Sequence, residues 1–218
     1  MMDTRPATLV RASDLLSRDV SVSSDEEPSP SRWRLTNLAG RLTEITGSAR
    51  LSSLAGIMRE AQVHGGGAAW ICVTGSLFFP PDFEQRGIRV SDIPIVMLTA
   101  QSGSGEVNPG DKAAKAGEIL LKSNAFSLVV MDLGSHRPGI AALGRMLRIA
   151  GVHGCAVVAL TDGEPALGSL TGLRVVAEHV RTECETGAIT LSITAVKDKQ
   201  AGPFWRETEV CRAPHGLC

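Results

Sequence analysis

The sequence lacks the features that mark metal, membrane or strongly nucleic-acid-binding proteins. It has no excess of positive charge, since its formal net charge is -1, so any contact with DNA would have to be local. Its 5 cysteines are widely spaced without a C-x-x-C pair, which argues against a zinc site or a disulfide framework. No apolar run reaches membrane-spanning length, and the N-terminus lacks the core of a signal peptide. We therefore expect a cytoplasmic protein with reduced thiols.

The composition is that of a globular α/β domain with an appendage. The chain has 218 residues, of which 43% are hydrophobic and 21% charged, enough to build a core without disulfides or metal. Residues 1–20 are expected to form an amphipathic helix, which either docks on a partner or belongs to a disordered tail. Residues 21–33 are acidic and proline-bearing, as in a flexible linker. Residues 34–218 are expected to form the folded core.

Within this core, apolar strands alternate with helices. Strands without polar alternation are expected at 68–74, 95–99, 127–133 and 155–160, and helices at 51–64, 113–122 and 140–150. This order predicts a mainly parallel sheet covered by helices on both faces. Three further strands, separated by short turns, are expected at 173–183, 188–197 and 205–211. They predict antiparallel strands at the C-terminal edge of the sheet.

A strand, a glycine and a helix in this order form the setting of a phosphate-binding loop. Such a loop needs G-x-x-x-x-G-K-[ST], in which backbone amides cradle phosphates and the lysine neutralises them. From Gly47 onward the sequence is GSARLSSL. Without a gap, Ser52 replaces the second glycine and Ser53 the lysine. With one residue deleted, Ser52 supplies the hydroxyl. Neither alignment provides a lysine, and the only nearby cation, Arg50, is out of register.

A second motif is the apolar run LVVMD, which ends at Asp132. It resembles the strand whose terminal acid holds magnesium in nucleotide-hydrolysing enzymes. The alternative is a buried strand that happens to end in aspartate. Gly47, Arg50, Ser52, Ser53 and Asp132 together are the residues of a degenerate nucleotide-binding site. The missing lysine removes a contact worth several kcal/mol in phosphoryl transfer, so we expect neither ATP binding nor catalysis, and no metal.

Taken together, these segments resemble the core of the RecA recombinase. Residues 40–47 (GRLTEITG) are similar to the strand that leads into the RecA phosphate loop, and residues 68–71 (AAWI) to its next core strand. Residues 86–93 (RGIRVSDI) resemble a further RecA stretch. The most specific match is residues 196–204 (VKDKQAGPF), which are similar to the RecA segment VKNKxAxPF. The resemblance covers about residues 34–212 and implies a RecA-like fold.

The sequence departs from RecA at the functional positions. The RecA glutamate that activates water corresponds to a position near Thr74, where no acid is adjacent. The first DNA-binding loop is reduced to residues 134–139, and the second to a short acidic segment after the strand at 155–160. We also expect no counterpart of the RecA C-terminal domain. Acidic side chains repel phosphates, so we expect weak or no direct DNA binding.

Degraded RecA-like proteins of this kind resemble the ImuA family, sometimes grouped with SulA-like cell-division inhibitors. That resemblance implies a non-catalytic accessory factor of SOS-induced translesion DNA synthesis, with RecA and the mutasome subunit ImuB as partners, and an error-prone polymerase reached through ImuB. Lys197, Lys199 and Phe204 are the candidate interface, although both lysines could instead be solvated residues near a strand end. The alternatives are a nucleotide-binding regulator with weak residual ATPase activity and a SulA-like inhibitor that binds FtsZ. The tryptophans Trp33 and Trp205 are expected near a partner surface.

Overall fold

The computed structural model describes residues 31–64, 66–73, 80–98, 107–163, 167–183 and 188–212. The helix expected over residues 1–20 lies outside these ranges, as does the expected linker except for residues 31–33. In chain order the elements are α2 (Leu35–Leu38), β1 (Leu42–Thr46), α3 (Arg50–Val63), β2 (Ala68–Val73), α4 (Pro80–Glu84), the 3-10 helix η1 (Val90–Asp92), β3 (Ile95–Leu98), α5 (Pro109–Lys122), β4 (Leu128–Gly134), α6 (Ile140–His153), β5 (Ala156–Thr161), the 3-10 helix η2 (Gly168–Leu170), β6 (Leu173–Glu183), β7 (Ala188–Asp198) and β8 (Arg206–Arg212).

The main helices lie where the hydrophobic pattern predicts them, and local signals set their ends. Helix α5 begins at Pro109, four residues before its expected start at Ala113. Asn108 caps it, because its side chain accepts a hydrogen bond from the Gly110 N–H at 2.9 Å, and proline has a helical φ already. Helix α6 ends before Gly154, whose φ of 63° is the left-handed conformation that terminates many helices.

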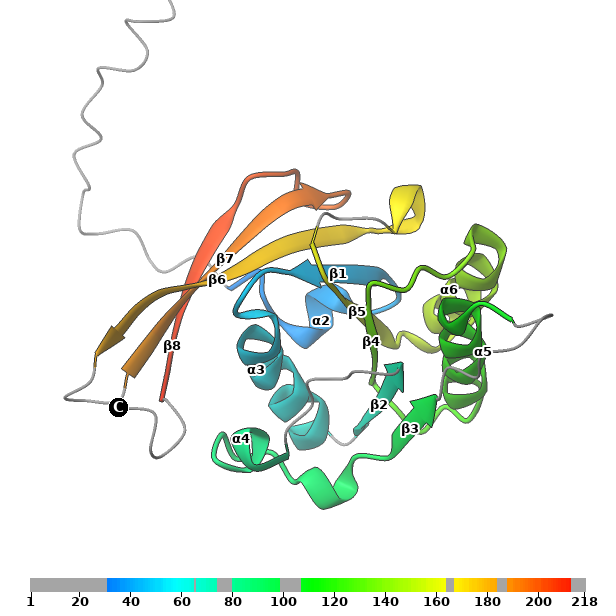
Figure 1. Ribbon diagram of the computed structural model, residues 1–218, viewed down its shortest axis with the longest axis horizontal. Helices are drawn as coiled ribbons and strands as arrows, with labels where there is room; N and C mark the ends of the chain where they lie inside the picture. Colours follow the sequence, from blue (N-terminus) through cyan, green and yellow to red (C-terminus); the bar gives the residue numbers. More distant parts are fainter. Residues whose placement is uncertain are drawn as a thin grey trace, which may run out of the picture. The chain divides into compact units, whose positions relative to one another are not determined.

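In the part of the chain that is described, eight strands form one sheet in the order β3-β2-β4-β5-β1-β6-β7-β8 (Figure 1). Every neighbouring pair from β3 to β6 is parallel. Strands β7 and β8 are antiparallel to their neighbours. The expected parallel sheet with antiparallel C-terminal strands is therefore confirmed. Strand β1 lies between β5 and β6, and this position decides what surrounds its carboxyl end.

Helices cover both faces of the parallel strands, so successive residues of each strand are buried against different partners (Figure 1). On β2, Trp70 packs in the cluster that contains α3, whereas Ile71 packs in the cluster that contains α5 and α6. Both side chains are fully buried. Burial on both faces explains the nearly continuous apolar runs in these strands.

Two tryptophans that were expected near a partner surface belong to the core. Trp33 is 6% exposed and Trp205 is 9% exposed. The Trp33 indole N–H donates to the Ser53 carbonyl of α3 at 2.9 Å, and the Trp205 indole N–H donates to the Asp198 carboxylate at 3.0 Å. Each indole N–H finds its hydrogen-bond partner inside the fold, which permits burial of the whole ring. That the two residues lie near a partner surface stays a prediction.

Other expected absences can be checked only within the described ranges. No helix there is both long enough and apolar enough to cross a membrane. The thiols of Cys155 and Cys211 are free, and burial raises the pKa of Cys155 to about 12. No group of three or more His, Cys, Asp or Glu side chains in these ranges is arranged to hold a metal ion.

Candidate functional site

The candidate phosphate loop is a connection of only three residues, Gly47 to Ala49, between β1 and α3. Gly47 has a φ of 97°, and a Cβ at this position would lie 2.2 Å from the Ala177 carbonyl oxygen of β6. The Ala49 N–H donates to the same oxygen at 3.0 Å. A phosphate-binding loop directs its amides into an open cradle. Here one of the few loop amides is bonded to β6, and the loop is packed against that strand.

Arg50 is the first residue of α3, and its charge is directed at an acid of this chain. Its guanidinium donates to the Asp162 carboxylate just beyond β5 at 2.7 Å and to the Gly47 carbonyl at 3.4 Å. The Arg50 side chain is 19% exposed and that of Asp162 is 52% exposed. An exposed pair of this kind stabilises a fold by about 1 kcal/mol or less. It nevertheless places a carboxylate beside the only cation of the loop.

The two candidate hydroxyl residues lie in the first turn of α3. Ser53 is fully buried, and its hydroxyl donates to the Arg50 carbonyl of the same helix at 3.0 Å. Ser52 is half-buried, and its carbonyl accepts a hydrogen bond from Arg86 at 3.1 Å. With Trp33 bonded to the Ser53 carbonyl, the first turn of α3 is held from two directions.

Asp132 lies on β4, two residues before the strand ends, and is 7% exposed. Its neighbours in the sheet are Cys72 on β2 and Leu160 on β5. Because β5 lies between β4 and β1, Asp132 and the Gly47 loop are separated by a whole strand. The structure therefore brings Gly47, Arg50 and Ser53 together, although the Ser53 hydroxyl is bonded to its own helix, and it separates Asp132 from them by a strand.

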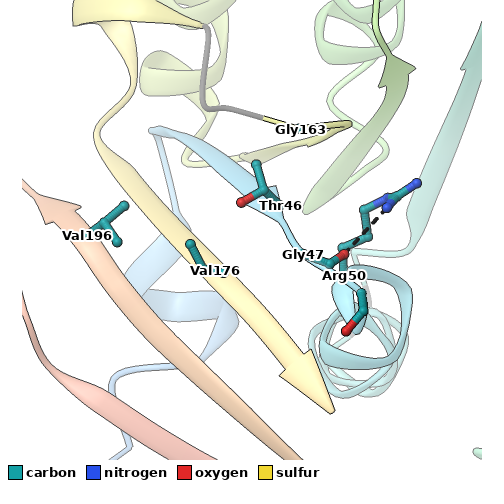
Figure 2. Close-up of a pocket in the computed structure, with 7 residues that line it drawn as sticks. Thr46, Gly47, Arg50, Gly163, Val176 and Val196 are labelled. Atoms are coloured by element: carbon teal, nitrogen blue, oxygen red, sulfur yellow. Dashed lines mark hydrogen bonds between the residues drawn. The ribbon is translucent and has the colours of Figure 1, made fainter.

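A pocket of about 560 Å³ opens beside the loop (Figure 2). Its volume lies in the range of small-molecule sites. Figure 2 shows Arg50 on one side of it, with the Arg50–Gly47 hydrogen bond dashed, and the two valines of β6 and β7 on the other. Arg50 is the only charged side chain among its described lining residues, which are Thr46, Gly47, Ser48, Arg50, Gly163, Val176 and Val196.

Two acids that matter for this region were missed by sequence reasoning. Glu44 lies in the middle of β1, is fully buried, and accepts hydrogen bonds from Arg174 at 2.8 Å and from the Thr161 hydroxyl at 3.3 Å. Asp162 is the partner of Arg50. An acid inside an apolar strand is a signal of a buried pair that could have identified Glu44. The role of Asp162 required knowledge that β1 and β5 are neighbours.

Residues 134–139, which were compared with the first DNA-binding loop of RecA, are held by internal hydrogen bonds. The Arg137 guanidinium donates to the carbonyls of Gly134 and His136 at 2.9 Å and to that of Asp162 at 3.3 Å. Asn108 donates to the Arg137 carbonyl at 2.7 Å. Arg137 therefore braces the ends of β4 and β5. The position near Thr74, where RecA has its catalytic acid, lies outside the described residues.

The candidate interface residues lie around the turn between β7 and β8. Lys197 donates to the Gly168 carbonyl at 3.3 Å, and Lys199 to the Ser169 carbonyl at 2.6 Å, so both lysines reach η2. Burial lowers the pKa of Lys197, and the positive charges of Lys199 and Arg174 lower it further. Phe204 is 80% exposed.

The sheet and its flanking helices define a RecA-like α/β fold. Among solved structures, the chain is similar to the crystal structure of the RadB recombinase, with a TM-score of 0.52 and 16% sequence identity over 78% of this chain and 86% of that chain. At this identity the likeness concerns the fold alone. No model of a known protein family matches the chain, and no curated protein matches it. Membership of the ImuA family therefore remains a prediction.

Proposed function

We propose that this chain is a non-catalytic RecA-fold accessory factor of SOS-induced translesion DNA synthesis, which acts by binding RecA, ImuB or both. The observation that carries the proposal is the closed connection between β1 and α3. Gly47 packs against Ala177, and the Ala49 amide is bonded to the Ala177 carbonyl. One of the three loop amides is thus taken by β6, whereas a phosphate cradle directs its amides at the ligand.

The charges around the connection also favour a role without ATP hydrolysis. Arg50, the only charged side chain among the described residues that line the pocket, is paired with Asp162 at 2.7 Å. Loss of one electrostatic contact to a transition state typically costs about 3 kcal/mol, or about a hundredfold in rate. A site without the lysine, in which the Ser53 hydroxyl is bonded to its own helix, would lose several such contacts.

A scaffold that has lost these groups can still present surfaces to other proteins. The segment that resembles RecA most closely, residues 196–204, contains an exposed aromatic side chain and two lysines beside η2. Direct DNA binding is not part of the proposal, since Asp162 and the braced 134–139 segment leave little free positive charge at the ends of β4 and β5.

The proposal is tested by binding and hydrolysis assays on the purified full-length chain. Biolayer interferometry with immobilised RecA, free or on single-stranded DNA, and with ImuB should detect reversible binding to at least one of them. ATP turnover should stay at background, and the Asp132→Ala variant should behave as the wild type. Binding to neither protein, or turnover that Asp132→Ala abolishes, would refute the proposal.

A nucleotide-binding regulator is the second candidate, and the pocket of about 560 Å³ beside Arg50 favours it. The exposed ion pair between Arg50 and Asp162 is weak enough for a ligand phosphate to displace the Asp162 carboxylate. Calorimetry with ATP and a non-hydrolysable analogue separates the two candidates. If this candidate is correct, Arg50→Ala abolishes the heat of binding, whereas Arg59→Ala, an exposed arginine of the same helix outside the pocket lining, leaves it unchanged.

A further inference from the structure

Phe204 combines two properties that a folded chain normally avoids. It is 80% exposed, so most of its apolar ring is in contact with water. Its φ is 70°, in the left-handed region that glycine and asparagine adopt readily and that is strained for a bulky side chain. The ring contributes little to the core, and its backbone conformation carries a cost. Strained residues that a structure maintains tend to lie at functional sites.

The turn around Phe204 is held rigidly from both sides. The Phe204 N–H donates to the Ala195 carbonyl at 2.8 Å, and the Ala195 N–H donates to the Trp205 carbonyl at 2.9 Å. Trp205 is buried and donates to Asp198 at 3.0 Å. The other Asp198 oxygen accepts from Arg41 at 2.9 Å. Buried anchors therefore fix the backbone beside an exposed ring, which lowers the entropy that the ring would lose on binding.

The side chains near this turn give it a positive charge. Lys197 and Lys199 donate only to carbonyls, and Arg206 donates to the Thr194 hydroxyl at 3.2 Å. Among the described residues, none of these three cations forms an ion pair. Asp198, the acid between the lysines, is 8% exposed and paired with Arg41. Its negative charge is therefore neutralised inside the fold.

We propose that Phe204 is a pre-organised aromatic anchor for a partner protein, and that the partner offers an apolar pocket bordered by carboxylates. The proposal rests on the proposed accessory function, since it takes a protein partner as given, and it adds the anchoring residue and the chemistry of the partner surface. An aromatic side chain that fills a pocket, surrounded by polar contacts that exclude water, is the usual centre of a protein interface. Lys197, Lys199 and Arg206 would pair with the bordering carboxylates.

The sharpest test is Phe204→Gly, because glycine removes the ring and also relieves the backbone strain. We expect this variant to melt at or above the wild-type temperature while its affinity for RecA or ImuB, whichever binds the wild type, falls at least tenfold. Phe204→Asn, which also tolerates a positive φ, should behave alike. Val210→Ala is the control: it shortens an exposed apolar side chain on β8, outside the turn that holds Phe204, and should bind as the wild type does.

Charge reversal tests the rim of the proposed surface. Lys197→Glu/Lys199→Glu should slow association, and the wild-type association rate should fall as salt is raised, whereas dissociation should change less. Unchanged association in both measurements would contradict a carboxylate-bordered partner.

The outcomes separate the anchor from the function. Wild-type affinity in both Phe204 variants would overturn the anchor and leave the accessory function standing. Melting of both variants well below the wild type would make Phe204 a structural residue and overturn the anchor as well. Failure of the wild type to bind RecA or ImuB would overturn both proposals. If sedimentation showed that the wild type self-associates and that both Phe204 variants do not, the partner would be a second copy of this chain. That result would refute the proposal that Phe204 anchors a different protein.

Discussion

Replacing Asp198 with asparagine should destabilise the C-terminal part of the sheet more than a comparable substitution at the surface does. Asp198 ends β7 and is 8% exposed. One oxygen accepts from the Arg41 guanidinium at 2.9 Å and from the N–H groups of Gln200 and Ala201 at 2.9 and 3.3 Å. The other accepts from the Trp205 indole at 3.0 Å. A single carboxylate thus joins the end of β7 to Arg41, which precedes β1, and to the turn before β8.

The magnitude follows from what asparagine leaves behind. Its amide has one acceptor oxygen, so at least one of these donors faces an N–H₂ group and loses its partner. Arg41, whose side chain is 10% exposed, keeps a charge without a counter-ion, and its Nε has no partner even in the wild type. Removal of one partner from a buried ion pair costs about 3 to 5 kcal/mol. For a chain of this size that is a fall in Tm of about 10 °C.

The same carboxylate should make the protein less stable in acid, because its pKa is lower in the folded than in the unfolded chain. Burial by itself raises the pKa of Asp198, but the hydrogen bonds from Gln200, Trp205, Ala201 and Arg41 together hold that pKa below its ordinary value of 3.8. A depressed pKa contributes stability that is fully present above about pH 4 and is lost as the pH falls through the folded-state pKa. The difference between wild type and Asp198→Asn should therefore be largest above pH 4 and shrink below it.

Urea unfolding followed by circular dichroism at pH 7, 5 and 3 measures both effects. Asp92→Asn is the matched control, because the pKa of Asp92 is also lowered, by hydrogen bonds from Arg89 and Ser91, but its side chain is 49% exposed. We expect no measurable change in that variant. If Asp198→Asn were as stable as the wild type at pH 7, or if its deficit grew on acidification, the reasoning about the buried carboxylate would be refuted.

Three further outcomes are expected from the same unfolding measurement. Gly47→Ala should lower the free energy of unfolding by at least about 3 kcal/mol, because its Cβ would meet the Ala177 carbonyl oxygen at 2.2 Å. Gly163→Ala is the control: this glycine also has a positive φ, but no atom lies within 4 Å of its Cβ position, so the loss should be only about 1 kcal/mol. Equal losses would contradict the close packing of Gly47 on β6. Glu209→Gln should be more stable than the wild type at pH 7, because burial and the charges of Glu60 and Glu207 raise the pKa of Glu209 against the opposing effect of Arg86. The difference should vanish near pH 4, where the carboxyl is protonated in the unfolded chain as well, and a loss of stability at pH 7 would contradict this. Trp33→Ala should lower the free energy of unfolding by about 3 to 5 kcal/mol, because the buried ring is removed. Trp33→Phe should lower it less, because it keeps an aromatic ring and loses only the hydrogen bond to Ser53. Unchanged stability of Trp33→Ala would mean that residues 31–38 do not pack on α3 as described.

The hydrophobic pattern was sufficient to predict most of the fold. The strand expected at 173–183 is β6 to the residue, and the other expected strands and main helices agree within a few residues. The short elements α2, α4, η1 and η2 were not predicted, because three to five residues carry too little periodicity to separate a helical turn from a loop. Helix α5 begins four residues before its predicted start, because the prediction followed the apolar residues and the capping residue Asn108 lies outside them.

The sequence by itself also determined that the phosphate loop lacks its lysine, since the identity of a side chain does not depend on folding. Only the tertiary structure placed Asp162 beside Arg50, Ala177 against Gly47, and the rings of Trp33 and Trp205 in the core. Asp162 and Ala177 lie far from Arg50 and Gly47 in the sequence and meet them because β1 runs between β5 and β6. Burial alternation within a strand records which face a side chain occupies, but it holds no information about which strand comes next in the sheet.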